Sequence, residues 1–307
     1  MSLTRVLFIS LSNIGDAVMT TPVLQALHAK YPEAKIDIVA DQRSSEIFLH
    51  CPYRGEIFHK EKRQFMRGGL SLLKRLRATR YGLVVDLRTD GLAYLLRADR
   101  RLTKWQGKAY GPHAVEQHMG IIFSLHGDNQ IPLCHIWLGE DEKSFARQAL
   151  GAYAGKRLLG LGPGANWPGK IWPKEKFLTL IQHMKHRFDA VILFGDDSDR
   201  ESSEFISANS KLPCVDLCGR TSLLQAAAVQ ELLNAFVGND SGLGHMASAM
   251  GIPSLTIFGS GKPDRYHPWG DKAVWLAGKD QVIDNVLVQD VAAFLDKHIL
   301  SCRGTRQ

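Results

Sequence analysis

The stretch RVLFISLSNIGDAVMTTPVLQALHAKYP, residues 5–32, decides the expected fold. An apolar run at 6–9 leads into a short polar loop, and a helical pattern follows. Strand, loop and helix in this order are typical of nucleotide-binding α/β units. The loop, 11–16, carries one glycine where a dinucleotide fingerprint needs three, and it ends in Asp16. The stretch therefore predicts an α/β unit with an acid, and not a phosphate loop, at the mouth of its first helix.

Length and composition indicate a soluble protein of two domains. The chain has 307 residues, 45% of them hydrophobic and 22% charged. No run approaches the roughly 18 apolar residues of a membrane-spanning helix, and the early strand leaves no room for a secretion signal. Five scattered cysteines favour a reducing compartment over a disulfide framework. We therefore expect a cytoplasmic protein.

The net charge of +7 is unevenly spread. Residues 54–80 contain nine Lys or Arg and two acids. Such a patch suits an anionic partner, but it also fits a solvated face of an amphipathic helix, because leucines at 70, 72, 73 and 76 supply an apolar side. Few aromatic residues interleave with the charges, so we do not expect nucleic acid to be the partner.

The hydrophobic pattern divides the chain into two similar halves. In the first half, we expect strands near 5–10, 35–40, 83–87 and 132–138, and helices near 16–30, 43–50, 66–79 and 113–126. In the second half, we expect strands at 157–161, 190–195, 214–217, 235–238, 254–259 and 273–278, a helix from Pro173 and a last helix near 289–300. Alternating strands and helices predict parallel sheets covered on both faces.

The predicted fold class is therefore α/β, with two Rossmann-like, doubly wound parallel-sheet domains facing a central cleft. We place the boundary in the polar stretch 139–156, which gives domains 1–150 and 151–307. The last helix is free to pack on either domain.

Two loops of the second half are candidates for anion binding. In GNDSGLGH, 238–245, a strand ends just before Asp240, Ser241 and Gly242, and a helix follows. The free amides of a helix start bind phosphate, although a plain capped helix would give the same pattern. In GPGANWPGKIWP, 162–173, Lys170 precedes a helix and is suited to neutralising a diphosphate. A loop lysine that is merely solvated is the alternative.

Four motifs occur together and in order: SNIGDAVMTTPVLQAL (12–27), HAVEQHMGIIFSL (113–125), GPGANWPGKIWP and GNDSGLGHMASAMGIPSLTIFG (238–259). Together they resemble the ADP-heptose:lipopolysaccharide heptosyltransferases of glycosyltransferase family 9, over nearly the whole chain. The resemblance implies a GT-B fold, with the nucleotide-sugar on the C-terminal domain and the acceptor on the N-terminal domain.

The resemblance also implies roles for individual residues. The donor-binding positions would be Asn166, Lys170, Glu201, Thr221, Asp240, Ser241, Gly242 and His245. The acceptor-binding positions would be Asn13, Gly15, Lys60, Lys62, Arg63 and Arg67. Asp16 and Lys170 would be catalytic. The H-x-x-E pair His113 and Glu116 is given a structural or acceptor-side role.

An inverting transfer needs a base and a stabilised leaving group. Asp16 would take the acceptor proton, while Lys170 and the amides at 241–242 would stabilise the departing nucleoside diphosphate. Lysine and a helix terminus can carry that charge, so we expect neither a metal nor a tightly bound cofactor. The D-x-D at 197–199 is interpreted as a surface loop.

The expected function is transfer of a heptose or related sugar, from ADP-heptose or another nucleotide-sugar, to a lipopolysaccharide core or related glycan. The expected protein is monomeric and cytoplasmic in a Gram-negative bacterium, with peripheral contact at the inner membrane face. Two alternatives remain open: a GT-B protein that only binds sugar nucleotides or has another specificity, and a nicotinamide-dependent oxidoreductase. The second lacks G-x-G-x-x-G after either opening strand.

Overall fold

The computed structural model describes residues 3–60 and 67–301, with side chains described for 3–60 and 69–297. The chain divides into two compact units, Met1–Trp137 and Leu138–Gln307. The division precedes the boundary that we placed at 150/151, because helix α7 (Glu140–Leu150) packs on α10 (Leu223–Glu231) of the second unit.

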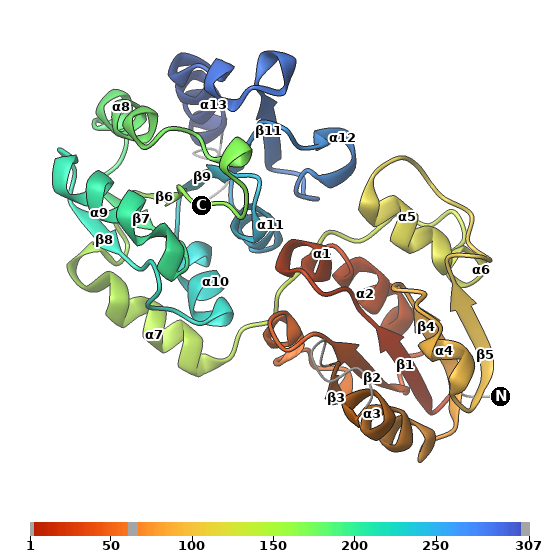
Figure 1. Ribbon diagram of the computed structural model, residues 1–307. Helices are drawn as coiled ribbons and strands as arrows, with labels where there is room; N and C mark the ends of the chain where they lie inside the picture. The colour runs from red at the N-terminus through yellow and green to blue at the C-terminus, as the bar shows by residue number, and fades with distance from the viewer. Residues whose placement is uncertain (1–2, 61–66, 302–307) are drawn as a thin grey trace. The chain divides into compact units, whose positions relative to one another are not determined.

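The first unit is built on five parallel strands in the order β3-β2-β1-β4-β5 (Figure 1). The strands are β1 (Arg5–Ile9), β2 (Lys35–Ala40), β3 (Arg54–His59), β4 (Tyr81–Asp86) and β5 (Ala98–Thr103). The helices are α1 (Ile14–Val18), α2 (Thr21–Lys30), the 3₁₀ turn η1 (Ser45–Phe48), α3 (Arg67–Arg77), α4 (Leu92–Leu95), α5 (Ala114–Ile121) and α6 (Phe123–His126).

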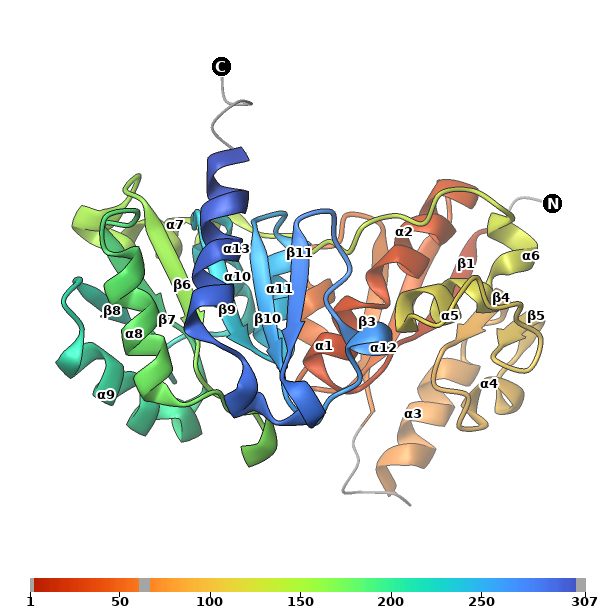
Figure 2. The same cartoon turned by 90° about the horizontal axis from the view of Figure 1, so that it is seen from above.

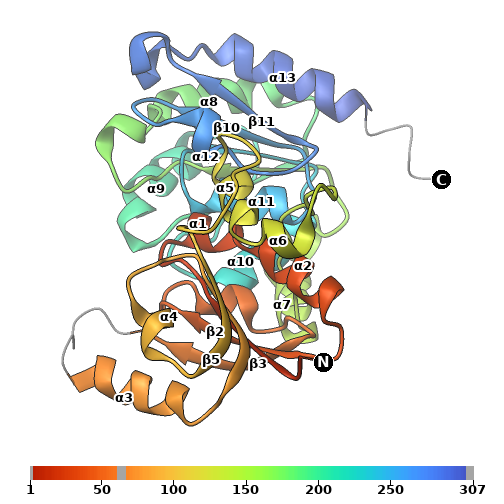
Figure 3. The same ribbon diagram turned by 90° about the vertical axis from the view of Figure 1, so that its right-hand side faces the viewer.

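Helices cover both faces of this sheet, as parallel strands require. Leu7, Ile9 and Val84 pack with α3 and α4 on one face, and α3 and α4 lie together in Figure 3. Strand residues of the opposite parity, such as Phe8, are fully buried on the other face, where Phe8 meets Phe48 edge-on. Helices α5 and α6 pack on α2.

The second unit holds six parallel strands in the order β11-β10-β9-β6-β7-β8. The strands are β6 (Leu158–Gly162), β7 (Ala190–Leu193), β8 (Cys214–Asp216), β9 (Ala235–Asn239), β10 (Ser254–Phe258) and β11 (Ala273–Ala277). The remaining helices are α8 (Lys174–Met184), α9 (Arg200–Asn209), α11 (Gly242–Ala249), α12 (Pro263–Tyr266) and α13 (Val288–Ser301). Counted along the chain, the order is the Rossmann 3-2-1-4-5-6, so the strand order reverses between β6 and β9.

The final helix completes the core of the second unit. Val291 and Leu295 of α13 are buried with Phe177 and Ile181 of α8 and with the central strands. Figure 2 shows α13 beside α8. The sequence left open on which domain the last helix packs; its described part packs on the second unit.

The structure corrects several expected elements. Segment 132–138 is not a strand: its backbone bonds to side chains of α2, through His135 N to Thr21 Oγ1 at 3.0 Å and Gln25 Nε2 to Leu133 O at 2.8 Å. The expected helix 16–30 is two helices, because Pro22 suits the first turn of a new helix and not the interior of a long one. Strands β3 and β5 were missed, since RGEIFH and ADRRLT carry the charges of edge strands.

Gly120 of α5 gives a test of this packing. A Cβ at Gly120 would lie 2.6 Å from Lys108 O and 2.9 Å from Ala109 Cα. Backbone cannot move aside cheaply, so Gly120→Ala should lower the free energy of unfolding by about 1–3 kcal/mol in urea denaturation. The matched control is Gly69→Ala in α3, where a Cβ meets nothing within 4 Å, and it should stabilise by up to about 1 kcal/mol. Equal effects of the two variants would contradict the packing described.

Candidate active site

The two anion-binding loops predicted in the second half meet at one place. They follow β6 and β9, the neighbouring strands between which the strand order reverses, and ligands of such sheets bind beyond the carboxyl ends at this point. Lys170 Nζ lies 2.5 Å from Asp240 Oδ2, with exposed side-chain fractions of 32% and 11%. Lys170 is the more exposed member of the pair, and Asp240 fixes the position of the ammonium.

Asn239, the last residue of β9, joins the two loops. Its fully buried side chain accepts from Trp172 N at 3.1 Å and donates to Pro163 O at 2.7 Å. Trp172 is itself fully buried, and its indole donates to Val286 O at 3.1 Å. One amide therefore holds both ends of the Lys170 loop on the strand that leads to Asp240.

Helix α11 starts directly after Asp240. Ser241 takes the N-cap position, but its side chain makes no capping bond, contrary to what its residue type suggested. The Ser241 hydroxyl is buried with no hydrogen-bond partner in the described structure. The amides that open α11 are therefore left uncapped by this side chain, as an anion site needs. His245, one turn on, is 6% exposed, so it supports the helix more than it faces solvent.

Three other predicted donor residues lie on separate loops of this edge. Asn166 is exposed in the loop after β6. Glu201 opens α9 and pairs with Lys174 Nζ at 2.9 Å, and that ammonium lowers the pKa of the Glu201 carboxyl. Thr221 is half-buried just before Ser222, which caps α10 by accepting from Gln225 N at 3.2 Å. They share an edge with Lys170 but come from three different strand ends.

The D-x-D motif forms a 3₁₀ turn, η4 (Asp197–Asp199), with a structural purpose. Asp199 Oδ2 accepts from Asp196 N at 3.0 Å, and a Cβ on Gly164 would overlap the Asp199 carboxylate. Burial raises the pKa of Asp199. Asp197 and Ser198 are exposed, as predicted for the whole motif, whereas Asp199 is half-buried. Among the described residues, no three His, Cys, Asp or Glu side chains gather as a metal site would require.

The sequence analysis missed the loop after β10. A Cβ on Gly261 would lie 2.9 Å from Asp240 Oδ2, and one on Gly169 would lie 3.2 Å from Ser260 Oγ. The Ser-Gly-Lys segment, residues 260–262, therefore packs closely against Asp240 and against the loop of Lys170. It brings the exposed Lys262 to the same edge of the sheet. The signal was available, because a strand followed by Gly-Ser-Gly-Lys resembles other loops that approach phosphate closely.

In the first unit, Asp16 lies where the order of that sheet reverses, between β1 and β4. The side chain of Asp16 is half-buried in α1, and its Oδ2 accepts from Asn13 Nδ2 at 2.8 Å. Gly15 precedes Asp16 in the same helical turn. The three residues that we assigned to the start of this loop and helix are therefore together.

The neighbouring loop after β4 contributes residues that were not predicted. Arg88 donates from its guanidinium to the Ser12 hydroxyl of the Asp16 loop. Thr89 has φ +52°, which is unusual for a β-branched residue. Buried Asp86 holds this backbone by accepting from Thr89 N at 2.8 Å and Arg88 N at 3.0 Å, and burial raises the pKa of Asp86. A strained residue beside a cation makes this loop a candidate part of the site.

The basic patch divides into paired and outlying charges. Lys60 forms an ion pair with Asp90, and Arg75 forms one with Glu56. The guanidinium carbon of Arg75 also lies 4.8 Å from the centroid of the Phe58 ring. Arg67 begins α3, and Lys62 and Arg63 lie outside the described residues. Part of the patch is therefore neutralised within the unit.

The H-x-x-E pair caps a helix, which is the structural one of the two roles that we left open. His113 Nδ1 accepts from Val115 N at 3.2 Å, and Glu116 Oε2 accepts from His113 N at 2.8 Å. This reciprocal capping box starts α5.

Asn239 provides the test of the loop geometry. Asn239→Ala should leave Trp172 N and Pro163 O without hydrogen-bond partners and lower the free energy of unfolding by at least about 2 kcal/mol. It should also weaken ADP binding, because the loop that carries Lys170 loses its anchor. Asn209→Ala, which removes an amide that bonds only Phe205 O near the end of α9, is the control. Calorimetric ADP titration and urea denaturation check both effects, and unchanged ADP affinity would separate Asn239 from the site.

Comparisons with known proteins follow this geometry. Residues 77–290 match the family described as "Glycosyltransferase family 9 (heptosyltransferase)". Lipopolysaccharide heptosyltransferase 2 of Salmonella typhimurium is 27% identical, over 88% of this chain and 86% of that protein. The solved E. coli ADP-heptose lps heptosyltransferase II superposes with a TM-score of 0.83 at 23% identity, covering 98% of this chain and 100% of its own. The structure of E. coli heptosyltransferase WaaC with ADP superposes with a TM-score of 0.78 at 18% sequence identity, covering 96% of this chain and 100% of that one.

The GT-B fold class predicted from the sequence is confirmed by these structures. The match decides against a nicotinamide-dependent oxidoreductase. The chain belongs to glycosyltransferase family 9, the heptosyltransferase family, and is a glycosyltransferase.

Proposed function

We propose that this enzyme is an inverting heptosyltransferase that uses ADP-heptose and a lipopolysaccharide core or related glycan acceptor. The second unit binds the nucleotide-sugar, and the first binds the acceptor. The observation that carries the proposal is the Lys170–Asp240 pair at the reversal point of a Rossmann sheet, beside the uncapped start of α11. The names of the relatives, which include an ADP complex, favour this donor.

On the donor side, the chain offers positive groups and hydrogen-bond donors for a diphosphate. Lys170 would contact the phosphates as a point charge, and the amides at 241–242 would add donors aligned with the helix dipole. When the bond between the anomeric carbon and the phosphate oxygen breaks, ADP leaves with the electron pair, and these groups stabilise its charge. Asn166, Glu201, Thr221 and His245 are proposed to shape the pocket for nucleoside and sugar.

On the acceptor side, Asp16 acts as the base. Its carboxylate takes the hydroxyl proton while the acceptor oxygen forms its bond to the anomeric carbon from the face opposite the phosphate. Asn13 keeps Oδ2 oriented through its 2.8 Å hydrogen bond. Gly15 allows close approach, and Lys60, Arg67 and Arg88 supply positive charge for an acidic glycan; Lys62 and Arg63 stay assigned to the same acceptor from the sequence.

Two substitutions separate the roles. Asp16→Asn should lower kcat by about 10²–10⁴-fold and leave ADP affinity unchanged, because only the proton acceptor is lost. Lys170→Ala should weaken ADP binding by about tenfold or more as well as slowing transfer. Exposed Asp128→Asn and Lys156→Ala are the controls. Transfer is measured by mass spectrometry with ADP- and UDP-sugars and lipopolysaccharide core acceptors.

Near wild-type turnover of Asp16→Asn would remove Asp16 as the base. ADP binding without transfer from any sugar nucleotide to any core acceptor would favour a protein that only binds nucleotides.

We also propose that α3 carries a membrane-facing surface of a cytoplasmic, monomeric enzyme. None of the described helices is long and apolar enough to cross a bilayer. Leu70 is 66% exposed, and an open groove of about 510 Å³ joins it to Lys74, Arg77 and Arg97. Helix α3 has no acidic residue. An apolar side chain among unpaired cations suits an anionic bilayer surface.

Vesicles of phosphatidylcholine and phosphatidylglycerol test this surface. Lys74→Glu with Arg77→Glu should weaken vesicle binding by at least about tenfold, since each basic residue near such a surface contributes about 1 kcal/mol. Lys185→Glu with Lys211→Glu, two exposed lysines of the second unit, is the control. Equal loss in both pairs would indicate an effect of net charge alone, and no loss in either would remove α3 from the contact.

A further inference from the structure

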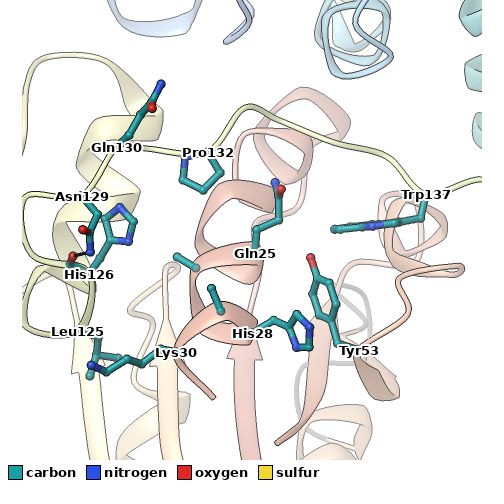
Figure 4. Close-up of a pocket in the computed structure, with 12 residues that line it drawn as sticks. Gln25, His28, Lys30, Tyr53, Leu125, His126, Asn129, Gln130, Pro132 and Trp137 are labelled. Atoms are coloured by element: carbon teal, nitrogen blue, oxygen red, sulfur yellow. Dashed lines mark hydrogen bonds between the residues drawn. The ribbon is translucent and has the colours of Figure 1, made fainter. Parts of the chain in front are cut away.

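The first unit has a second groove, of about 640 Å³, that the proposed reaction does not use. It runs over the last turns of α2, between α6 and the segment that follows it on one side and Tyr53 and Trp137 on the other. Figure 4 shows His126, Asn129 and Gln130 on the first side, Tyr53 and Trp137 on the second, and Gln25 between them. A volume of this size suits a small organic ligand.

This groove lies at the amino edge of the sheet. Tyr53 directly precedes β3, and its carbonyl accepts from Ile36 N at the start of β2 at 3.3 Å. Asp16 follows the carboxyl end of β1, at the opposite edge. Helix α2 runs between the two edges, and its ten residues span about 15 Å. A ligand in the groove would therefore not occupy the proposed catalytic edge.

One end of the groove is aromatic. The Tyr53 ring stacks on His28 with centroids 4.2 Å apart and planes 6° from parallel. Trp137 meets Tyr53 edge-on at 5.5 Å and 85°. Both Tyr53 and Trp137 remain half-buried, so they offer rigid apolar surface to a ligand.

The other end is polar and positive. The exposed amides of Asn129 and Gln130 and the ammonium of Lys30 line it, and no Asp or Glu is among the lining residues. His126 Nε2 on this side, and His28 Nδ1 beside Tyr53 at the aromatic end, are buried with no partner in the described structure. A buried nitrogen without a hydrogen-bond partner lowers the stability of the fold. If either imidazole ring rotated toward the groove, a ligand with hydrogen-bonding groups would supply the missing partner.

We infer that this groove binds an acidic oligosaccharide. A groove with aromatic surface at one end suits the faces of sugar rings, and side-chain amides suit their hydroxyls. The ammonium of Lys30, with no Asp or Glu among the lining residues, favours a carboxylate- or phosphate-bearing chain over a neutral one. The site is distinct from the proposed acceptor edge, and its occupancy does not depend on transfer.

Calorimetric titration with trigalacturonic acid, in saturating ADP, tests the site against neutral maltotriose and inorganic phosphate. Trigalacturonate should bind at least about tenfold more tightly than maltotriose and phosphate. Lys30→Ala with His126→Ala should weaken it by about tenfold or more. The matched control, Lys156→Ala with His183→Ala, removes exposed groups of the second unit and should change nothing.

Localisation uses two further variants. Trp137→Leu should also weaken binding of the acidic trisaccharide, while ADP binding stays at the wild-type value. Lys60→Ala with Arg88→Ala, at the opposite edge, should leave this affinity unchanged. Absence of saturable binding, equal affinity for phosphate alone, or loss only in the Lys60 and Arg88 variant would overturn the inference.

Discussion

Parallel strands covered by helices on both faces confine chemistry to the loops at the ends of the strands. In both units the central strands are buried from either side, so no strand side chain of the core can reach a ligand. At the point where the strand order reverses, two neighbouring loops lead away in opposite directions and leave room for a ligand between them. Lys170 and Asp240 in one unit, and Asp16 and Arg88 in the other, occupy this same position.

The ion pair of Lys170 and Asp240 has a consequence for nucleotide binding. Without a ligand, the carboxylate neutralises and positions the ammonium at 2.5 Å. In the proposed donor site, an arriving diphosphate would share the lysine with Asp240, and its affinity would reflect the difference between two ion pairs and not one new contact. Removing Asp240 alone would therefore free the lysine but leave it without orientation, which distinguishes Asp240 from a residue that merely touches the donor.

Hydrophobic runs made much of the fold predictable. Strands such as β6 and β9 are continuous apolar segments, and the loops after them carried recognisable glycine, lysine and aspartate. Edge strands β3 and β5 escaped because their charges hide the pattern, whereas 132–138 has a strand pattern but bonds to α2 side chains. Lys170 and Asp240 were each identified, but 70 residues separate them, and only the sheet order makes them neighbours. Arg88 and residues 260–262 were not predicted as site residues, because their places beside the two pairs follow from the same strand order and from no local motif that we had considered.

Each unit carries its own complete core, and the described chain passes from one to the other once, at Trp137–Leu138. Helix α13 packs in the core of the second unit with α8. The chain thus consists of two units, each with its own core, that meet at one point of the sequence. If the two units divide donor and acceptor binding as proposed, recombination at this joint would pair an existing donor unit with a new acceptor unit, and glycan diversity would arise by exchange of whole units as well as by point substitution.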